Sequence, residues 1–122
     1  MNKILIIDDE VRAVMFLKRI LERKGYEVIT SFNGEKALEV IKYEKLDIIL
    51  LDIRMPGIDG IEVLRRVRKF CKNVGIIMVT AINDKEVGIK ALESGANGYI
   101  TKPIDLNHLE TIIRDIMFEH LP

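Results

Sequence analysis

One run of consecutive aliphatic residues limits the folds that this chain can adopt. Residues 48–51 read Ile-Ile-Leu-Leu, and Pro56-Gly57 stops the segment soon afterwards. A strand that is apolar at every position is typical of a parallel sheet covered by helices on both faces. Asp52 follows directly, so we expect its carboxylate at the carboxyl edge of the sheet, where such sheets place their ligands. Taken alone, Asp52 is equally compatible with an ordinary turn residue.

Length and cysteine content indicate a single domain that needs no disulfide bonds. Its 122 residues suit one domain, residues 1–122, which is large enough to bury a core without disulfides or a structural metal. Cys71 is the single cysteine, and the sequence has no uncharged apolar stretch of membrane-spanning length. We therefore expect a soluble cytoplasmic protein.

The charge pattern argues against two classes of partner. The sequence has 19 basic and 19 acidic residues and no Trp. Such a balance gives no electrostatic footprint for nucleic acid or for a membrane surface. We therefore predict no direct binding to either.

Four further segments have the composition of strands. They are rich in β-branched and aromatic residues, and several end in a polar side chain. They are residues 3–7, 26–30, 75–80 and 98–101.

Helical periodicity fills the intervals between these strands. One helix is predicted over residues 11–24, a second between Asn33 and Asp47, a third up to about Phe70, a fourth ending at Gly95 and a fifth from Asp105. The predicted caps include a capping box, in which the Asp59 side chain accepts an early backbone N–H and Glu62 reaches back. Asn83 or Asp84 is expected to cap the fourth helix.

Alternating strands and helices predict an α/β doubly wound fold with a five-stranded parallel sheet. Right-handed crossovers, together with central positions for the most apolar strands, give the strand order 2-1-3-4-5. All the carboxyl ends of a parallel sheet lie on one edge. The polar residues that follow the strands should therefore converge there; they are Asp8, Asp9, Asp52, Thr80 and Lys102.

This convergence has a chemical meaning. Two carboxylates at about 4 Å repel by on the order of 4 kcal/mol at an effective dielectric near 20. An all-oxygen cluster of this kind suits Mg²⁺, with Mn²⁺ as a substitute. Together with the Lys102 ammonium and the Thr80 hydroxyl, it would also favour a phosphoryl group, with an Asp carboxylate as nucleophile. Each residue alone has an ordinary structural explanation, and only the joint placement argues for a site.

At these residues the chain resembles the receiver domain of bacterial two-component response regulators. The resemblance rests on Asp8-Asp9, Asp52 with Met55-Pro56-Gly57, Thr80-Ala81 and Lys102-Pro103, each after its strand, and it covers essentially the whole chain. It implies a CheY-like fold, a variant of the flavodoxin-like topology, with a cis Lys102-Pro103 peptide bond.

The resemblance also implies a role for each site residue. Asp52 would accept phosphate from a phosphohistidine on a histidine kinase or phosphotransfer protein, and Lys102 would bind a phosphoryl oxygen. Thr80 and Tyr99 would be switch residues. The Mg²⁺ ligands would be Asp8, Asp9, Asp52 and the backbone carbonyl of Arg54. Such a chain phosphorylates and dephosphorylates only itself and is not a turnover enzyme.

Several expectations concern the rim and the partners. Arg54 and Ile82 lie at positions that vary in the family and tune access of water to the phosphoryl group; Arg54 would pair with an acidic neighbour or with the phosphoryl group. The first helix has more apolar residues than one buried face needs, and in the family this helix docks the phosphodonor. Neither His108 nor His120 is expected to carry a phosphoryl group.

Two hypotheses describe the output of this chain. In the family, phosphorylation remodels the surface of the fourth helix, fifth strand and fifth helix, which contacts a downstream effector protein or domain. One hypothesis is a phosphorylation-dependent homodimer through this surface, and the other is a monomeric relay.

Two other classes share parts of this pattern. A flavodoxin-like cofactor-binding module has the same topology, but its first loop should offer hydroxyls and glycines to a phosphate, whereas this chain offers Asp8-Asp9-Glu10. A Mg²⁺-dependent Asp-nucleophile phosphatase usually has a second acid two residues after the nucleophile. Arg54 occupies that position here.

Overall fold

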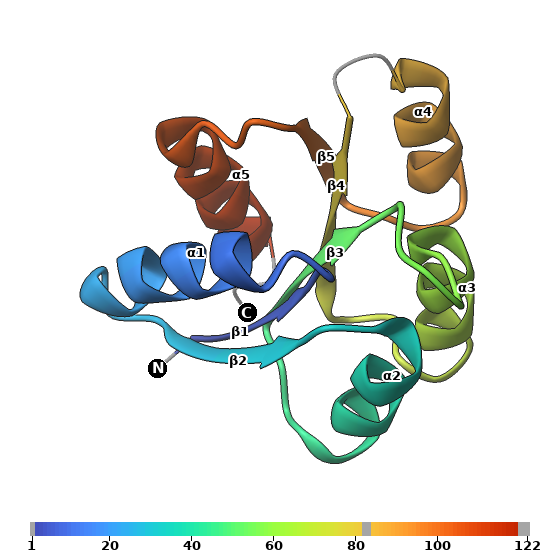
Figure 1. The fold of residues 1–122 in the computed structure, drawn as a ribbon, viewed down its shortest axis with the longest axis horizontal. Coiled ribbons are helices and arrows are strands. Elements are labelled where there is room, and N and C mark those ends of the chain that lie inside the picture. Colours follow the sequence, from blue (N-terminus) through green and yellow to red (C-terminus); the bar gives the residue numbers. More distant parts are fainter. Residues whose placement is uncertain (1, 82–83, 120–122) are drawn as a thin grey trace.

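The computed structural model describes residues 2–81 and 84–119, which form one five-stranded parallel sheet between two layers of helices (Figure 1). In chain order the elements are β1 (Lys3–Ile7), α1 (Val11–Arg23), β2 (Glu27–Ser31), α2 (Gly34–Tyr43), β3 (Ile48–Asp52), α3 (Gly60–Phe70), β4 (Gly75–Thr80), α4 (Lys85–Glu93), β5 (Gly98–Thr101) and α5 (Leu106–Glu119). Ile82, Asn83 and His120, named above, lie outside the described residues. No helix in the described ranges has the length and apolar character that a membrane span requires.

The strand order is β2-β1-β3-β4-β5, which confirms the predicted topology. All neighbouring strands pair in parallel, so their carboxyl ends share one edge. The register brings the two acidic strand ends together, because Ile7 of β1 pairs with Leu51 of β3, and Asp8 and Asp52 are the next residues.

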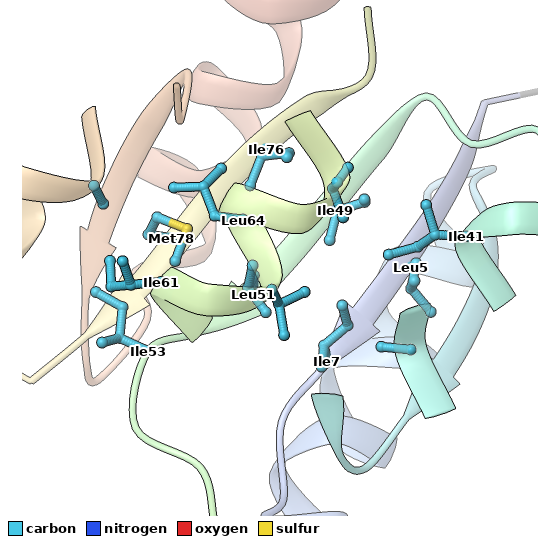
Figure 2. Close-up of a cluster of buried hydrophobic side chains, with 14 of the residues drawn as sticks. Leu5, Ile7, Ile41, Ile49, Leu51, Ile53, Ile61, Leu64, Ile76 and Met78 are labelled. Atoms are coloured by element: carbon cyan, nitrogen blue, oxygen red, sulfur yellow. The ribbon is translucent and has the colours of Figure 1, made fainter. Parts of the chain in front are cut away.

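The central strands are buried on both faces, as the aliphatic runs predict. Every residue of β3 and β4 is buried. Alternate side chains of β3 enter two separate apolar clusters, Ile49 and Leu51 on the face of α2 and α3, and Ile48 and Leu50 on the face of α1 and α5. Figure 2 shows the first cluster, in which Leu64 of α3 lies beside Met78 of β4. The sheet is therefore a rigid platform for the groups at its edge.

The observed helix caps confirm only some of the caps that the sequence predicts. Asp59 accepts the Glu62 N–H at 3.0 Å and Asp105 accepts from Asn107 and His108, as predicted. The return half of the capping box is wrong, because the Glu62 carboxylate instead accepts from Arg66 at 2.9 Å, one turn along the same helix. Asp84 occupies the cap position of α4 but makes no side-chain capping bond.

A half-buried arginine fastens the far end of α4. Arg68 of α3 donates from Nε to the Gly95 carbonyl and from Nη2 to Asn97 Oδ1, each at 2.8 Å. The same Asn97 oxygen accepts the Ile76 N–H at 2.8 Å. The network ties the carboxyl end of α4 to α3 and β4.

The first residue of α3 lies against the backbone that carries Asp52. Gly60 donates its N–H to the Ile53 carbonyl at 2.8 Å. A β-carbon at Gly60 would lie 2.8 Å from Ile53 Cα and closer still to the Asp52 carbonyl oxygen. No side chain fits between this helix and the end of β3.

We therefore predict that Gly60→Ala lowers the free energy of unfolding by roughly 2–3 kcal/mol, because the backbone must shift to admit the methyl group. Gly25→Ala is the matched control. Gly25 has a φ of 98° with nothing within 4 Å of an added β-carbon, so only backbone strain of about 1 kcal/mol opposes it. Urea unfolding of the two variants measures the difference, and equal losses would contradict the steric role of Gly60.

Candidate functional site

The predicted acidic residues do converge at the edge of the sheet. Asp8 and Asp9 follow β1, and Asp52 ends β3; each contributes a carboxylate oxygen to a group whose members lie within 4.8 Å of one another. Asp8 and Asp52 are buried, with 8% and 6% of their surface exposed, whereas Asp9 is exposed. Two carboxylates are therefore withdrawn from water while the third faces it.

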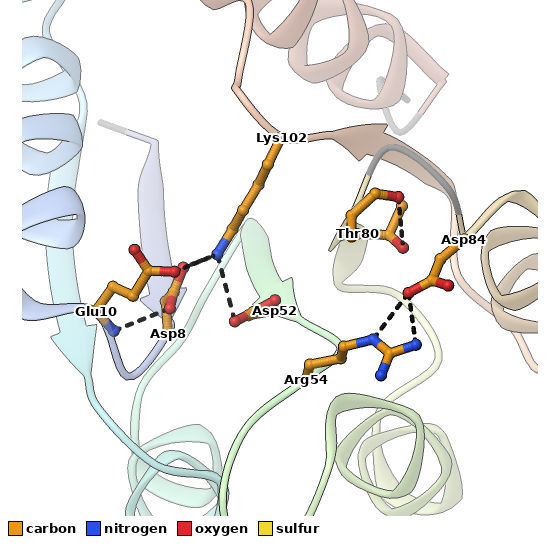
Figure 3. Close-up of polar contacts among 8 residues, drawn as sticks. Asp8, Glu10, Asp52, Arg54, Thr80, Asp84 and Lys102 are labelled. Atoms are coloured by element: carbon orange, nitrogen blue, oxygen red, sulfur yellow. Dashed lines mark hydrogen bonds and ion pairs between the residues drawn. The ribbon is translucent and has the colours of Figure 1, made fainter.

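Lys102, which follows β5, brings a positive charge to this cluster. Its Nζ lies 3.2 Å from Asp8 Oδ2, 3.1 Å from Glu10 Oε1 and 3.6 Å from Asp52 Oδ2. Figure 3 shows the ammonium between the ends of β1 and β3. The Lys102-Pro103 peptide bond is cis, which confirms that prediction.

The carboxylates of the site outnumber Lys102, the cation beside them. Burial and the nearby Asp8 carboxylate raise the pKa of Asp52 to about 6, against a smaller opposing effect of Lys102. Burial lowers the pKa of Lys102, but its carboxylate partners outweigh this and the net shift is upward. Lys102 therefore stays protonated, and its single charge does not fully compensate the acids around it.

This charge imbalance predicts that Asp52→Asn stabilises the metal-free protein. The folded-state pKa of Asp52 lies above its ordinary value of 3.8. The folded state therefore binds the proton more tightly, and stability falls as pH rises from 3.8 towards about 6. In urea unfolding with a chelator present, the variant should gain about 2 kcal/mol at pH 7.

The gain should shrink as the pH falls towards the ordinary pKa, because Asp52 is then neutral in both states. Asp115→Asn, at an exposed acid of α5, controls for the loss of a negative charge. A gain at Asp52 that does not depend on pH would contradict this account.

Thr80 and Tyr99 lie on the neighbouring strands. Thr80 ends β4 with 2% of its surface exposed, and its hydroxyl donates a long hydrogen bond of 3.5 Å to the Ala81 carbonyl. This bond is weak and easily exchanged for a better acceptor. Tyr99 of β5 is half-buried, and its ring lies against Gly88 of α4, where an added β-carbon would meet it at 2.9 Å.

Arg54 follows β3 and turns away from the acids. Its Nε and Nη2 both lie 2.8 Å from Asp84 Oδ2, at the start of α4 (Figure 3). Of the two pairings that the sequence left open, the structure has the acidic neighbour. The sequence alone does not identify Asp84 as that neighbour, because its position before the fourth helix predicts a helix cap. A partner 30 residues away on another loop leaves no local pattern to read.

The oxygen-rich cluster fits a hard divalent cation. Its donors are carboxylates, one of them exposed, and burial together with the Asp8 carboxylate raises the pKa of Asp52, so a cation held there would favour its ionised form. Mg²⁺ is a cation of this kind, and Asp8, Asp9 and Asp52 are the residues that would hold it. The role of the Arg54 carbonyl as a ligand stays a prediction.

The doubly wound sheet and its acidic edge define the class of protein. The family model of the response regulator receiver domain matches residues 4–114. The chain belongs to this family, whose members are the phosphoaccepting domains of two-component response regulators.

Individual relatives agree with this assignment. Sporulation initiation phosphotransferase F of Bacillus subtilis is 34% identical over 99% of this chain and 94% of that protein. The alkaline phosphatase synthesis transcriptional regulatory protein PhoP of the same organism is 40% identical over 95% of this chain, which spans only 48% of that protein. The chain likewise spans about half of several other transcriptional regulators that it resembles.

Solved structures show the same fold over the full length. A two-component response regulator from Clostridium difficile superimposes with a TM-score of 0.93 at 31% identity, covering 100% of both chains. The receiver domain of the Francisella response regulator 1452 gives a TM-score of 0.92 at 30% identity over 99% of this chain.

Proposed function

We propose that residues 1–122 act as one receiver domain in which Asp52 accepts a phosphoryl group from a phosphohistidine of a histidine kinase or phosphotransfer protein. The observation that carries this proposal is the position of Asp52. It is a buried carboxylate at a strand end, within 4.8 Å of two other acids and 3.6 Å from the Lys102 ammonium.

The chemistry follows from these positions. An Asp52 carboxylate oxygen attacks phosphorus, the bond from phosphorus to the imidazole nitrogen of the donor breaks, and the imidazole leaves with that electron pair. Mg²⁺ held by Asp8, Asp9, Asp52 and the Arg54 carbonyl would supply positive charge to the phosphoryl oxygens. Both buried carboxylates are already close to Lys102, so its ammonium reaches an oxygen that arrives between them.

Thr80 and Tyr99 act after the transfer as switch residues. The weak bond from the Thr80 hydroxyl to the Ala81 carbonyl is given up for a phosphoryl oxygen, which is the stronger acceptor. Tyr99 then moves inward as Thr80 leaves its space. Before this movement the Tyr99 ring contacts Gly88 of α4, so its departure changes the surface that α4 and β5 present.

The product is one aspartyl phosphate per chain and not repeated turnover. The phosphatase alternative needs a general acid two residues after the nucleophile, and Arg54, which keeps its proton, stands there. Protonation of a leaving group by that residue is therefore excluded.

The first test is intact mass spectrometry after incubation with Mg²⁺ and a small acyl phosphate. We expect one added phosphoryl group on the wild-type chain and none on Asp52→Asn, because the nucleophile is lost. Omission of Mg²⁺ should abolish the addition, because the acids then repel the donor.

Asp115→Asn is the matched control and should be phosphorylated like the wild type. Equal phosphorylation of Asp52→Asn would assign the phosphoryl group elsewhere. No addition to the wild-type chain would remove the proposed function.

The phosphodonor is proposed to dock on α1 beside the acidic edge. Val11, Met15 and Phe16 on this helix are exposed by 50%, 44% and 65%. A groove of about 440 Å³ runs between α1 and the segment after β5, and its walls include Phe16, Leu17 and Ile104 together with Asp8 and Lys102. Apolar side chains next to the phosphoacceptor suit the helical surface that carries a phosphohistidine.

Phe16→Glu should slow phosphoryl transfer from a histidine kinase that phosphorylates the wild type by about tenfold, because it puts a charge into an apolar contact. Transfer from the small acyl phosphate should be unchanged. Tyr43→Glu is the matched control, since Tyr43 is an aromatic residue exposed by 87% on α2. Equal slowing with both donors would mean that Phe16 does not act through docking.

The output surface is proposed to be the face of α4, β5 and α5. It includes Lys85, Lys90, Tyr99 and Asn107, and α4 adds the exposed apolar side chains of Ile89 and Leu92. Such a mixed surface suits a downstream effector protein or domain, or a second copy of the phosphorylated chain.

A further inference from the structure

The ion pair between Arg54 and Asp84 connects α4 to the phosphoacceptor loop, which is the segment that follows Asp52 at the end of β3. Arg54 stands two residues after Asp52, and Asp84 directly precedes α4. Two guanidinium nitrogens lie 2.8 Å from the same carboxylate oxygen, Asp84 Oδ2. In Figure 3 the guanidinium points towards Asp84 and away from Asp52.

The Asp84 carboxylate is diverted from the role its position would give it. Asp at the residue before a helix normally accepts a backbone N–H of the first turn. Asn33 and Asp59 do this at α2 and α3, at 2.9 and 3.0 Å. Asp84 makes no such bond, and its carboxylate is held by Arg54 instead.

The pair is positioned to break when a stronger acceptor arrives. The Arg54 side chain is 72% exposed and that of Asp84 20%, and ion pairs with one partner in water contribute little to stability. A phosphoryl group on Asp52 carries more negative charge than a carboxylate and accepts two parallel bonds from a guanidinium. Arg54 is close enough in the chain for its long side chain to reach it.

When the Arg54–Asp84 ion pair breaks, a capping hydrogen bond between Asp84 and α4 can replace it. Once Arg54 has gone, Asp84 can take the extended backbone conformation that Asn33 and Asp59 have, and its carboxylate can then accept an N–H from the first turn of α4, at Glu86 or Val87. This capping bond offsets the lost ion pair.

We propose, on the basis of the function proposed above, that Arg54 exchanges partners on phosphorylation. It leaves Asp84 for the phosphoryl oxygens on Asp52, and Asp84 then caps α4. Phosphorylation is thereby coupled to the amino end of α4 by a second connection, separate from Thr80 and Tyr99.

The test measures the affinity of beryllofluoride, an anion with the shape and charge of a phosphoryl group, in the presence of Mg²⁺ by calorimetry. The proteins are the wild type, Asp84→Asn, Arg54→Gln and the double variant. If Asp84 competes for Arg54, then Asp84→Asn frees the guanidinium in advance and tightens binding by about two- to fivefold. Asn keeps an oxygen that can cap α4.

The Arg54→Gln background separates this competition from the general loss of a negative charge. We expect Asp84→Asn to have no effect there, and Arg54→Gln alone to weaken binding. In the wild type, amide exchange at Glu86 and Val87 should slow when the anion binds.

An unchanged affinity in Asp84→Asn, or the same gain in both backgrounds, would overturn the exchange. Failure of the wild-type chain to bind the anion would overturn the proposed function itself, which is a different result.

Discussion

The repulsion among the acids at the carboxyl edge is the constraint on which the rest of the site depends. Asp8 and Asp52 are both buried, and parallel pairing of β1 with β3 leaves them side by side. Lys102 is close to both, but it approaches from β5, two strands away from β3. The charge that holds the site together is thus supplied by the last strand of the sheet, and a site of this kind needs the whole fold.

The parts of this structure that follow from the sequence are those set by periodicity and topology. Residues 48–51 are apolar at every position because both faces of β3 are covered, so the strand and its two helical layers could be predicted together. Convergence of Asp8, Asp52 and Lys102 followed because parallel strands place their carboxyl ends on one edge.

The parts that could not be predicted involve a choice between nearly equal partners. Glu62 has both a backbone N–H and the guanidinium of Arg66 within reach, and local sequence does not rank them. Asp84 likewise has a cap position beside it and Arg54 across a loop. These alternatives differ by about 1 kcal/mol or less, which is below what a residue pattern can resolve.

The two ends of α4 are fastened with unequal strength. At its carboxyl end the half-buried Arg68 makes hydrogen bonds to Gly95 and Asn97, and Asn97 is in turn bonded to the backbone of β4. At its amino end the ion pair of Arg54 and Asp84, in which only the Arg54 side chain is exposed, joins α4 to the loop that follows Asp52. Because the hydrogen bonds of Arg68 hold the carboxyl end of α4 in place, we expect a movement of the loop beside Asp52 to displace the first turn of α4 most. The displacement should become smaller along the helix and be least at its last turn.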